Sequence, residues 1–97
     1  MDRTALETRW LTLTRETLPA AAAKRGWPVR FDHCFQRILL DNAVGGFWRD
    51  HIEPPAYRNA DDEVLGDAIQ LGEDALAGRA DMHALNAQSL KWRGKQR

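Results

Sequence analysis

The sequence predicts an all-α fold: a compact single domain of four to five helices in an orthogonal or bundle-like array. Three observations support this class. Apolar residues recur at the helical period of 3.6 residues, no segment alternates apolar and polar residues as a half-buried strand does, and glycine or proline separates the periodic segments. A chain of 97 residues can bury one core and is too short for two domains. We therefore expect one helical domain over 1–93 and a flexible basic tail over 94–97.

The first helix is expected over residues 2–18. One face of this helix has the spacing i, i+4, i+7 and i+11, formed by Leu6, Trp10, Leu13 and Thr17. Pro19 is expected to end it, because proline lacks an N–H donor and its ring clashes with the preceding turn. Pro19 is also a candidate for the first position of a short alanine-rich helix through 20–25, and Gly26 ends that helix.

The most amphipathic segment lies within residues 31–48. At 100° per residue, one face gathers Phe31, Cys34, Phe35, Ile38, Leu39 and Asn42. Its apolar members are expected in the core, with Asp32 as the N-cap and Gly45-Gly46 at the end. Arg37 and Asp41 are four residues apart, a spacing that favours an ion pair on a solvated helix face.

An irregular loop is expected over 45–60, because Pro54-Pro55 disfavours both helix and central strand. The next helix begins at Asp61 or Asp62, whose carboxylates suit an N-cap, and Gly78 follows its end near residue 77. Asp81 caps the last helix. The inner face of that helix contains Met82, Leu85, Asn86, Ser89, Leu90, Trp92 and Arg93.

Polar residues on these inner faces raise the question of a site. A buried Asn42 amide needs partners, which are either backbone groups or a ligand. The polar residues of the last helix either satisfy Asp41 and Asn42 internally or line a pocket. We expect a polar cleft between the central helix, the 45–60 loop and the last helix. Its candidate ligand-binding residues are Arg37, Asp41, Asn42, Trp48, His51, Asn86, Ser89 and Arg93.

The net charge of zero conceals a segregation along the chain. Residues 1–49 contain eight basic and five acidic residues. Residues 50–81 contain two basic and nine acidic residues, and residues 82–97 contain four basic residues and no acidic one. One interpretation is that the acidic helix packs beside basic segments. The alternative is a weak nucleic-acid-binding module that uses Lys91, Trp92, Arg93, Lys95 and Arg97. The neutral overall charge argues against it.

A second alternative is a small enzyme using acid–base or anion-holding groups on His33, Arg37, Asp41 and His51. We assign no catalytic residue. Cys34 and the histidines match no zinc spacing, and a Cys34–His51 nucleophile pair is disfavoured because Cys34 lies on the apolar stripe. No glycine-rich phosphate loop precedes a helix. We expect neither a metal nor a cofactor.

The single cysteine fits a reducing compartment. No apolar run approaches transmembrane length, and the first residues lack the apolar core of a signal peptide. These features predict a cytoplasmic protein with no membrane partner.

The segments FDHCFQRILLDNAVGGFW and ALNAQSLKWRGK resemble a group of short bacterial proteins without established chemistry, some of which carry an acetyltransferase label. The resemblance covers most of residues 31–95 and implies no functional residues. An acetyltransferase would need a mixed sheet and a pyrophosphate-binding turn, which this sequence does not predict. We therefore expect a small non-enzymatic binding or adaptor module for a protein partner or a small polar or anionic ligand.

Overall fold

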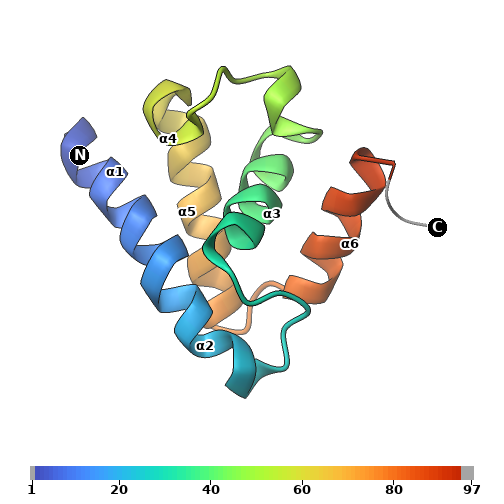
Figure 1. Cartoon of the computed structure of the whole chain (residues 1–97). Coiled ribbons are helices and arrows are strands. Elements are labelled where there is room, and N and C mark those ends of the chain that lie inside the picture. The colour runs from blue at the N-terminus through green and yellow to red at the C-terminus, as the bar shows by residue number, and fades with distance from the viewer. Residues whose placement is uncertain (1, 95–97) are drawn as a thin grey trace.

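A computed structural model describes residues 2–94 of the chain (Figure 1). Over this range the regular structure is helical, which confirms the predicted all-α class. The elements in order are α1 (Arg3–Thr12), η1 (Leu13–Thr17), α2 (Leu18–Arg25), α3 (Asp32–Val44), η2 (Trp48–Asp50), α4 (Ala56–Asn59), α5 (Asp62–Leu76) and α6 (Met82–Trp92). The predicted tail, apart from Gly94, lies outside the described residues.

The prediction that Pro19 ends the first helix was wrong. The segments α1, η1 and α2 follow one another without a break and together form the amino-terminal rod, which is coloured in shades of blue in Figure 1. The five residues of η1 form a π-helix, and the Leu18 N–H donates to the carbonyl of Leu13. Pro19 lies in the first turn of α2, in agreement with its second candidate role, and a missing N–H costs little there. Gly26 ends α2 in the left-handed region, at a φ of 64°.

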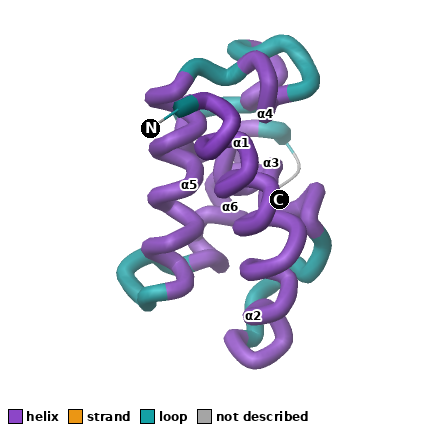
Figure 2. Tube along the Cα trace, turned by 90° about the vertical axis from the view of Figure 1, so that its left-hand side faces the viewer, coloured by secondary structure: helices purple, strands orange, loops and turns teal. Residues whose placement is uncertain are grey.

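Helix α3 lies at the centre of the molecule, between α5 and α6 (Figure 1). Its side chains Phe35, Ile38 and Leu39 are fully buried. Gly72 of α5 lets both α3 and η1 approach closely, since a Cβ atom there would lie 3.1 Å from Leu39 Cδ1 of α3 and 2.7 Å from Leu13 Cδ2 of η1. The segment between α3 and α5 crosses one end of the helices (Figure 2). This segment was predicted to be irregular, yet it contains η2 and the single turn of α4.

Two expectations for α3 were wrong by one residue. The N-cap is Phe31 rather than Asp32, and the Asp32 carboxylate instead accepts from the His33 N–H at 2.8 Å. Because Phe31 has an extended backbone, it precedes the helix, and its side chain is 66% exposed instead of buried. Near the other end, the buried polar residue is Asp41 rather than Asn42. Asp41 is fully buried, whereas Asn42 is only half-buried.

The two predicted aspartate caps are confirmed where they were expected. The Asp61 side chain accepts from the Val64 N–H at the start of α5. Asp81 does the same for His83 at the start of α6. Each cap satisfies a backbone amide that has no partner within its helix. These two helix starts could therefore be predicted from the local sequence.

Helix α5 carries many of the acids of the chain and packs against α1. Arg3 of α1 contacts Asp62 at 2.7 Å, and Arg9 contacts Glu73 at 2.5 Å. This arrangement agrees with the interpretation that the acidic helix lies beside a basic segment. Such exposed pairs contribute little stability each, so they explain the charge pattern more than the fold.

Candidate ligand-binding site

A buried carboxylate joins the central helix to the last helix. Asp41 of α3 accepts from Ser89 Oγ at 2.7 Å and from Arg93 Nε and Nη2 at 2.7 and 3.0 Å. It also accepts from the backbone N–H of Trp48 at 3.0 Å. Four donors thus surround a carboxylate that has no exposed surface. The network holds α3, α6 and the start of η2 together.

Ser89 extends this network toward a second arginine. Its hydroxyl donates to Asp41 and accepts from Arg37 Nη1 at 2.8 Å. Arg37 Nη2 donates to Asn86 Oδ1, also at 2.8 Å. The predicted surface pair between Arg37 and Asp41 is therefore wrong, because the Arg37 guanidinium reaches across to α6. The result is a fixed chain from Arg37 through Ser89 and Asp41 to Arg93.

The side-chain amide of Asn42 is hydrogen-bonded to two backbone carbonyls. Its Nδ2 donates to the carbonyls of Ile38 at 2.8 Å and Leu85 at 3.0 Å. Its side chain borders a separate shallow hollow between α3 and α5, with Ala43, Asp67, Gln70, Leu71 and Asp74. The structure does not bring Asn42 to one cleft with Trp48, Asn86 and Arg93. Asn42 therefore links α3 to α6 through its hydrogen bond to the Leu85 carbonyl.

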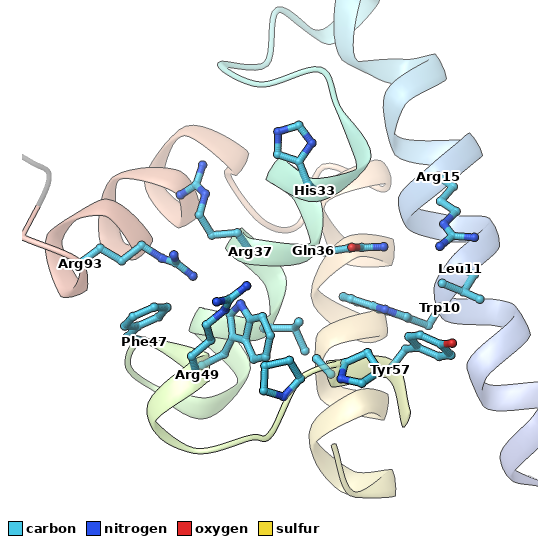
Figure 3. A pocket seen from close by; sticks show the side chains of 15 residues that line it. Trp10, Leu11, Arg15, His33, Gln36, Arg37, Phe47, Arg49, Tyr57 and Arg93 are labelled. Atoms are coloured by element: carbon cyan, nitrogen blue, oxygen red, sulfur yellow. The ribbon is translucent and has the colours of Figure 1, made fainter. Parts of the chain in front are cut away.

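A cavity of about 620 Å³ lies between the amino-terminal rod, α3 and the segment that follows α3 (Figure 3). Its polar lining consists of Arg15, His33, Gln36, Arg37, Arg49 and Arg93. Its aromatic lining consists of Trp10, Phe47, Trp48 and Tyr57. Figure 3 shows Arg37, Arg49, Arg93 and Phe47 toward one end and Arg15, Trp10 and Tyr57 toward the other. The cavity therefore combines cationic and aromatic surfaces.

The charge of this lining is one-sided. Among the described residues, no aspartate or glutamate lines the cavity. Asp41, which does not line the cavity, forms an ion pair with Arg93. Arg37 instead donates hydrogen bonds to the uncharged side chains of Ser89 and Asn86. Burial lowers the pKa of the Arg37 guanidinium from its usual value, and the nearby charge of Arg93 acts in the same direction. The cavity thus presents positive charge that is partly removed from water.

Two arginines lie over aromatic rings of the lining. The Arg93 Cζ atom is 4.2 Å from the ring centroid of Phe47, and the Arg49 Cζ atom is 5.4 Å from that of Trp48. Stacking of this kind orients a guanidinium while leaving its edge N–H groups available. The aromatic residues therefore serve as a support for the cations as well as a wall.

The sequence-predicted residues divide into three groups. Arg37, Trp48 and Arg93 line the cavity, while Asp41, Asn86 and Ser89 hold two of its arginines in place. His51 is exposed and outside the lining, so the His33, Arg37, Asp41 and His51 set of the enzyme hypothesis does not share one cavity. Of the proposed nucleic-acid set, Lys91 is exposed and Trp92 half-buried, Arg93 is engaged by Asp41, and Lys95 and Arg97 lie outside the described residues.

The predicted set of site residues lacked several polar and aromatic residues of the lining, namely Trp10, Arg15, Gln36, Phe47, Arg49 and Tyr57. One signal was available on the central helix. His33, Gln36, Arg37 and Leu40 have the spacing i, i+3, i+4 and i+7, which marks a second helix face opposite the apolar stripe. That face is the one that lines the cavity. Tyr57 lies in the 45–60 loop, which the sequence analysis places beside the cleft.

Within residues 2–94, no group of three or more histidine, cysteine, aspartate or glutamate side chains is placed to hold a metal ion. No helix over the same range is long and apolar enough to cross a membrane. Comparisons of the chain with protein-family models, curated proteins and solved structures found no match.

Proposed function

We propose that this protein is a small binding module whose ligand carries an anionic group attached to an aromatic or similarly flat apolar part. The ligand would occupy the cavity between the amino-terminal rod, α3 and the segment after α3. The single cysteine favours a reducing compartment, and we place the protein in the cytoplasm on that ground.

The observation that carries the proposal is the unbalanced charge of the cavity lining. Arg15, Arg37 and Arg49 face a space with no lining carboxylate among the described residues, whereas Arg93 is already paired with Asp41. Charged groups removed from water are stabilised by an opposite charge. A ligand anion would supply that charge to Arg37, whose present partners are both neutral.

Arg37 and Arg93 are also held in place by protein groups before any ligand binds. Arg37 uses Nη1 and Nη2 to bond α6, and Arg93 uses Nε and Nη2 to bond Asp41. A guanidinium has five N–H donors, so each retains donors for a ligand. Side chains that are ordered before binding lose less entropy when a ligand arrives. This favours a specific anion site over loose surface attraction.

The rest of the lining selects the apolar part. Four aromatic rings contribute to the walls, and a volume of about 620 Å³ falls in the range of small-molecule sites. An aryl group placed among these rings would gain offset or edge-to-face contacts. Neither inorganic phosphate nor a neutral arene would use both surfaces, so we expect each to bind more weakly than a molecule that combines them.

The test is a titration of the full chain with benzoate and phenyl phosphate, followed by calorimetry and by the fluorescence of the tryptophans in the wall. Benzyl alcohol and inorganic phosphate are the comparison ligands. We expect the aryl anions to bind and the comparison ligands to bind at least about tenfold more weakly, since a charged hydrogen bond contributes about 1.5–3 kcal/mol. Equal affinity for benzoate and benzyl alcohol would contradict the proposal.

Two variants locate the binding. Arg37→Met and Arg49→Met each remove one cation of the lining, and each should weaken benzoate binding. Arg79→Met is the matched control, because Arg79 pairs with Asp74 far along the chain and does not line the cavity. Melting temperatures of all three variants separate loss of a contact from loss of the fold. Unchanged affinity in both lining variants would show that the anion binds elsewhere.

A further inference from the structure

The amide of Gln36 has a fixed orientation in the cavity wall. Thr14 is fully buried, and its hydroxyl donates to the carbonyl of Trp10 at 3.0 Å. A threonine hydroxyl has one proton, so Thr14 can only accept from a further neighbour. The Gln36 side chain lies 3.0 Å from the same oxygen. The atom that faces Thr14 is therefore the Gln36 nitrogen, and the choice between amide nitrogen and oxygen is settled by the hydrogen bonds.

The π-helix supplies this arrangement. Thr14 belongs to η1, and Arg15, the next residue of η1, lines the cavity. A single π-turn contains one more residue than an α-helical turn, so it changes the faces on which the following residues lie, and such turns are frequent at functional sites. Here η1 presents a buried acceptor to α3 and a cation to the cavity from two successive residues.

The Gln36 oxygen is consequently left as an acceptor. It takes part in no hydrogen bond among the described residues, and it is not sealed from solvent, because no buried side-chain oxygen or nitrogen of these residues lacks a partner. Gln36 lines the cavity and lies between its arginine-rich end and the Trp10 side (Figure 3). The arginines around it offer only donors.

We propose that Gln36 determines the specificity of the cavity by accepting a hydrogen bond from a hydroxyl or amino group of the ligand. The ligand class is thus an aryl anion that also bears a hydrogen-bond donor on its ring. Thr14 is a positioning residue that keeps the Gln36 oxygen turned away from the rod. This inference rests on the proposed function, because it refines the chemistry of the same site.

The experiment compares 3- and 4-hydroxybenzoate with their methoxy counterparts and with benzoate, each titrated calorimetrically into the full chain. The methoxy group is a hydrogen-bond acceptor that cannot donate. We expect at least one hydroxybenzoate to bind about threefold to tenfold more tightly than its methoxy counterpart. Binding of benzoate without that preference would overturn this inference alone. Failure of every aryl anion to bind would overturn the proposed function as well.

Two variants assign the preference to the amide. Gln36→Met keeps the length of the side chain and removes the amide oxygen, so it should abolish the preference for the hydroxybenzoate over its methoxy counterpart. Thr14→Val frees the amide to turn, so it should reduce the preference for a donor while Gln36 remains. The ratio of the two affinities is insensitive to a general loss of stability. Retention of the full preference in Gln36→Met would overturn the assignment.

Discussion

The carboxylate of Asp41 and the guanidinium of Arg93 form a two-pronged ion pair, with Nε–Oδ2 and Nη2–Oδ1 distances of 2.7 and 3.0 Å. The aspartate is fully buried, and the side chain of Arg93 is 19% exposed. The pair ties the last helix to the central one. It also sets one arginine of the cavity at a fixed position.

Asp41→Asn should destabilise the fold by about 2–4 kcal/mol, because it leaves the Arg93 charge without its partner inside the protein. Urea unfolding followed by circular dichroism measures the free energy of unfolding. The double variant with Arg93→Met is the control, and its loss should be smaller than the sum of the two single losses. Strict additivity would show that the pair contributes no coupling energy.

Gly72→Ala should lower stability although alanine is the better helix former. The added Cβ would lie 2.7 Å from Leu13 Cδ2 and 3.1 Å from Leu39 Cδ1, and overpacking of this kind costs about 1–3 kcal/mol. Gly66→Ala, on the same helix, is the matched control, since its Cβ would meet nothing within 4 Å. That variant should gain up to about 1 kcal/mol. Thermal unfolding of both variants reports the sign, and a stabilised Gly72→Ala would refute the close approach of α5.

Phe31→Ser should change the free energy of unfolding by no more than about 0.5 kcal/mol, because the ring is largely exposed. Phe35→Ala should cost about 3–5 kcal/mol, since that ring is fully buried in the core. Chemical denaturation of the two variants measures both values. Similar losses in both would place Phe31 in the core, as the sequence periodicity alone predicts.

Benzoate binding should weaken as sodium chloride is raised from about 0.05 to 0.5 M, because salt screens attraction to a partly exposed cationic site. Calorimetric titrations at several salt concentrations give the slope of log Kd against log salt. In Arg49→Met the slope should be shallower, whereas in Arg79→Met it should match the unchanged protein. A salt-independent affinity would argue for purely apolar binding.

Local patterns were sufficient to predict the all-α class, the aspartate caps at Asp61 and Asp81, the glycine end of α2 and most of the core stripe of α3. These features depend on hydrogen bonds and periodicity within a few residues, so local sequence contains the needed information. The continuous rod through Pro19 escaped prediction because a π-turn has no clear local signature.

The partners of Asp41 and the residues that line the cavity could not be predicted from local patterns, because they depend on how the helices pack. Ser89 and Arg93 are 48 and 52 residues away from Asp41 along the chain, and helix packing rather than spacing brings them together. A helix-surface pair between Arg37 and Asp41 satisfies local rules equally well. The choice between the two arrangements depends on how α6 lies against α3, and that packing also turns Arg37 and Arg93 toward one cavity.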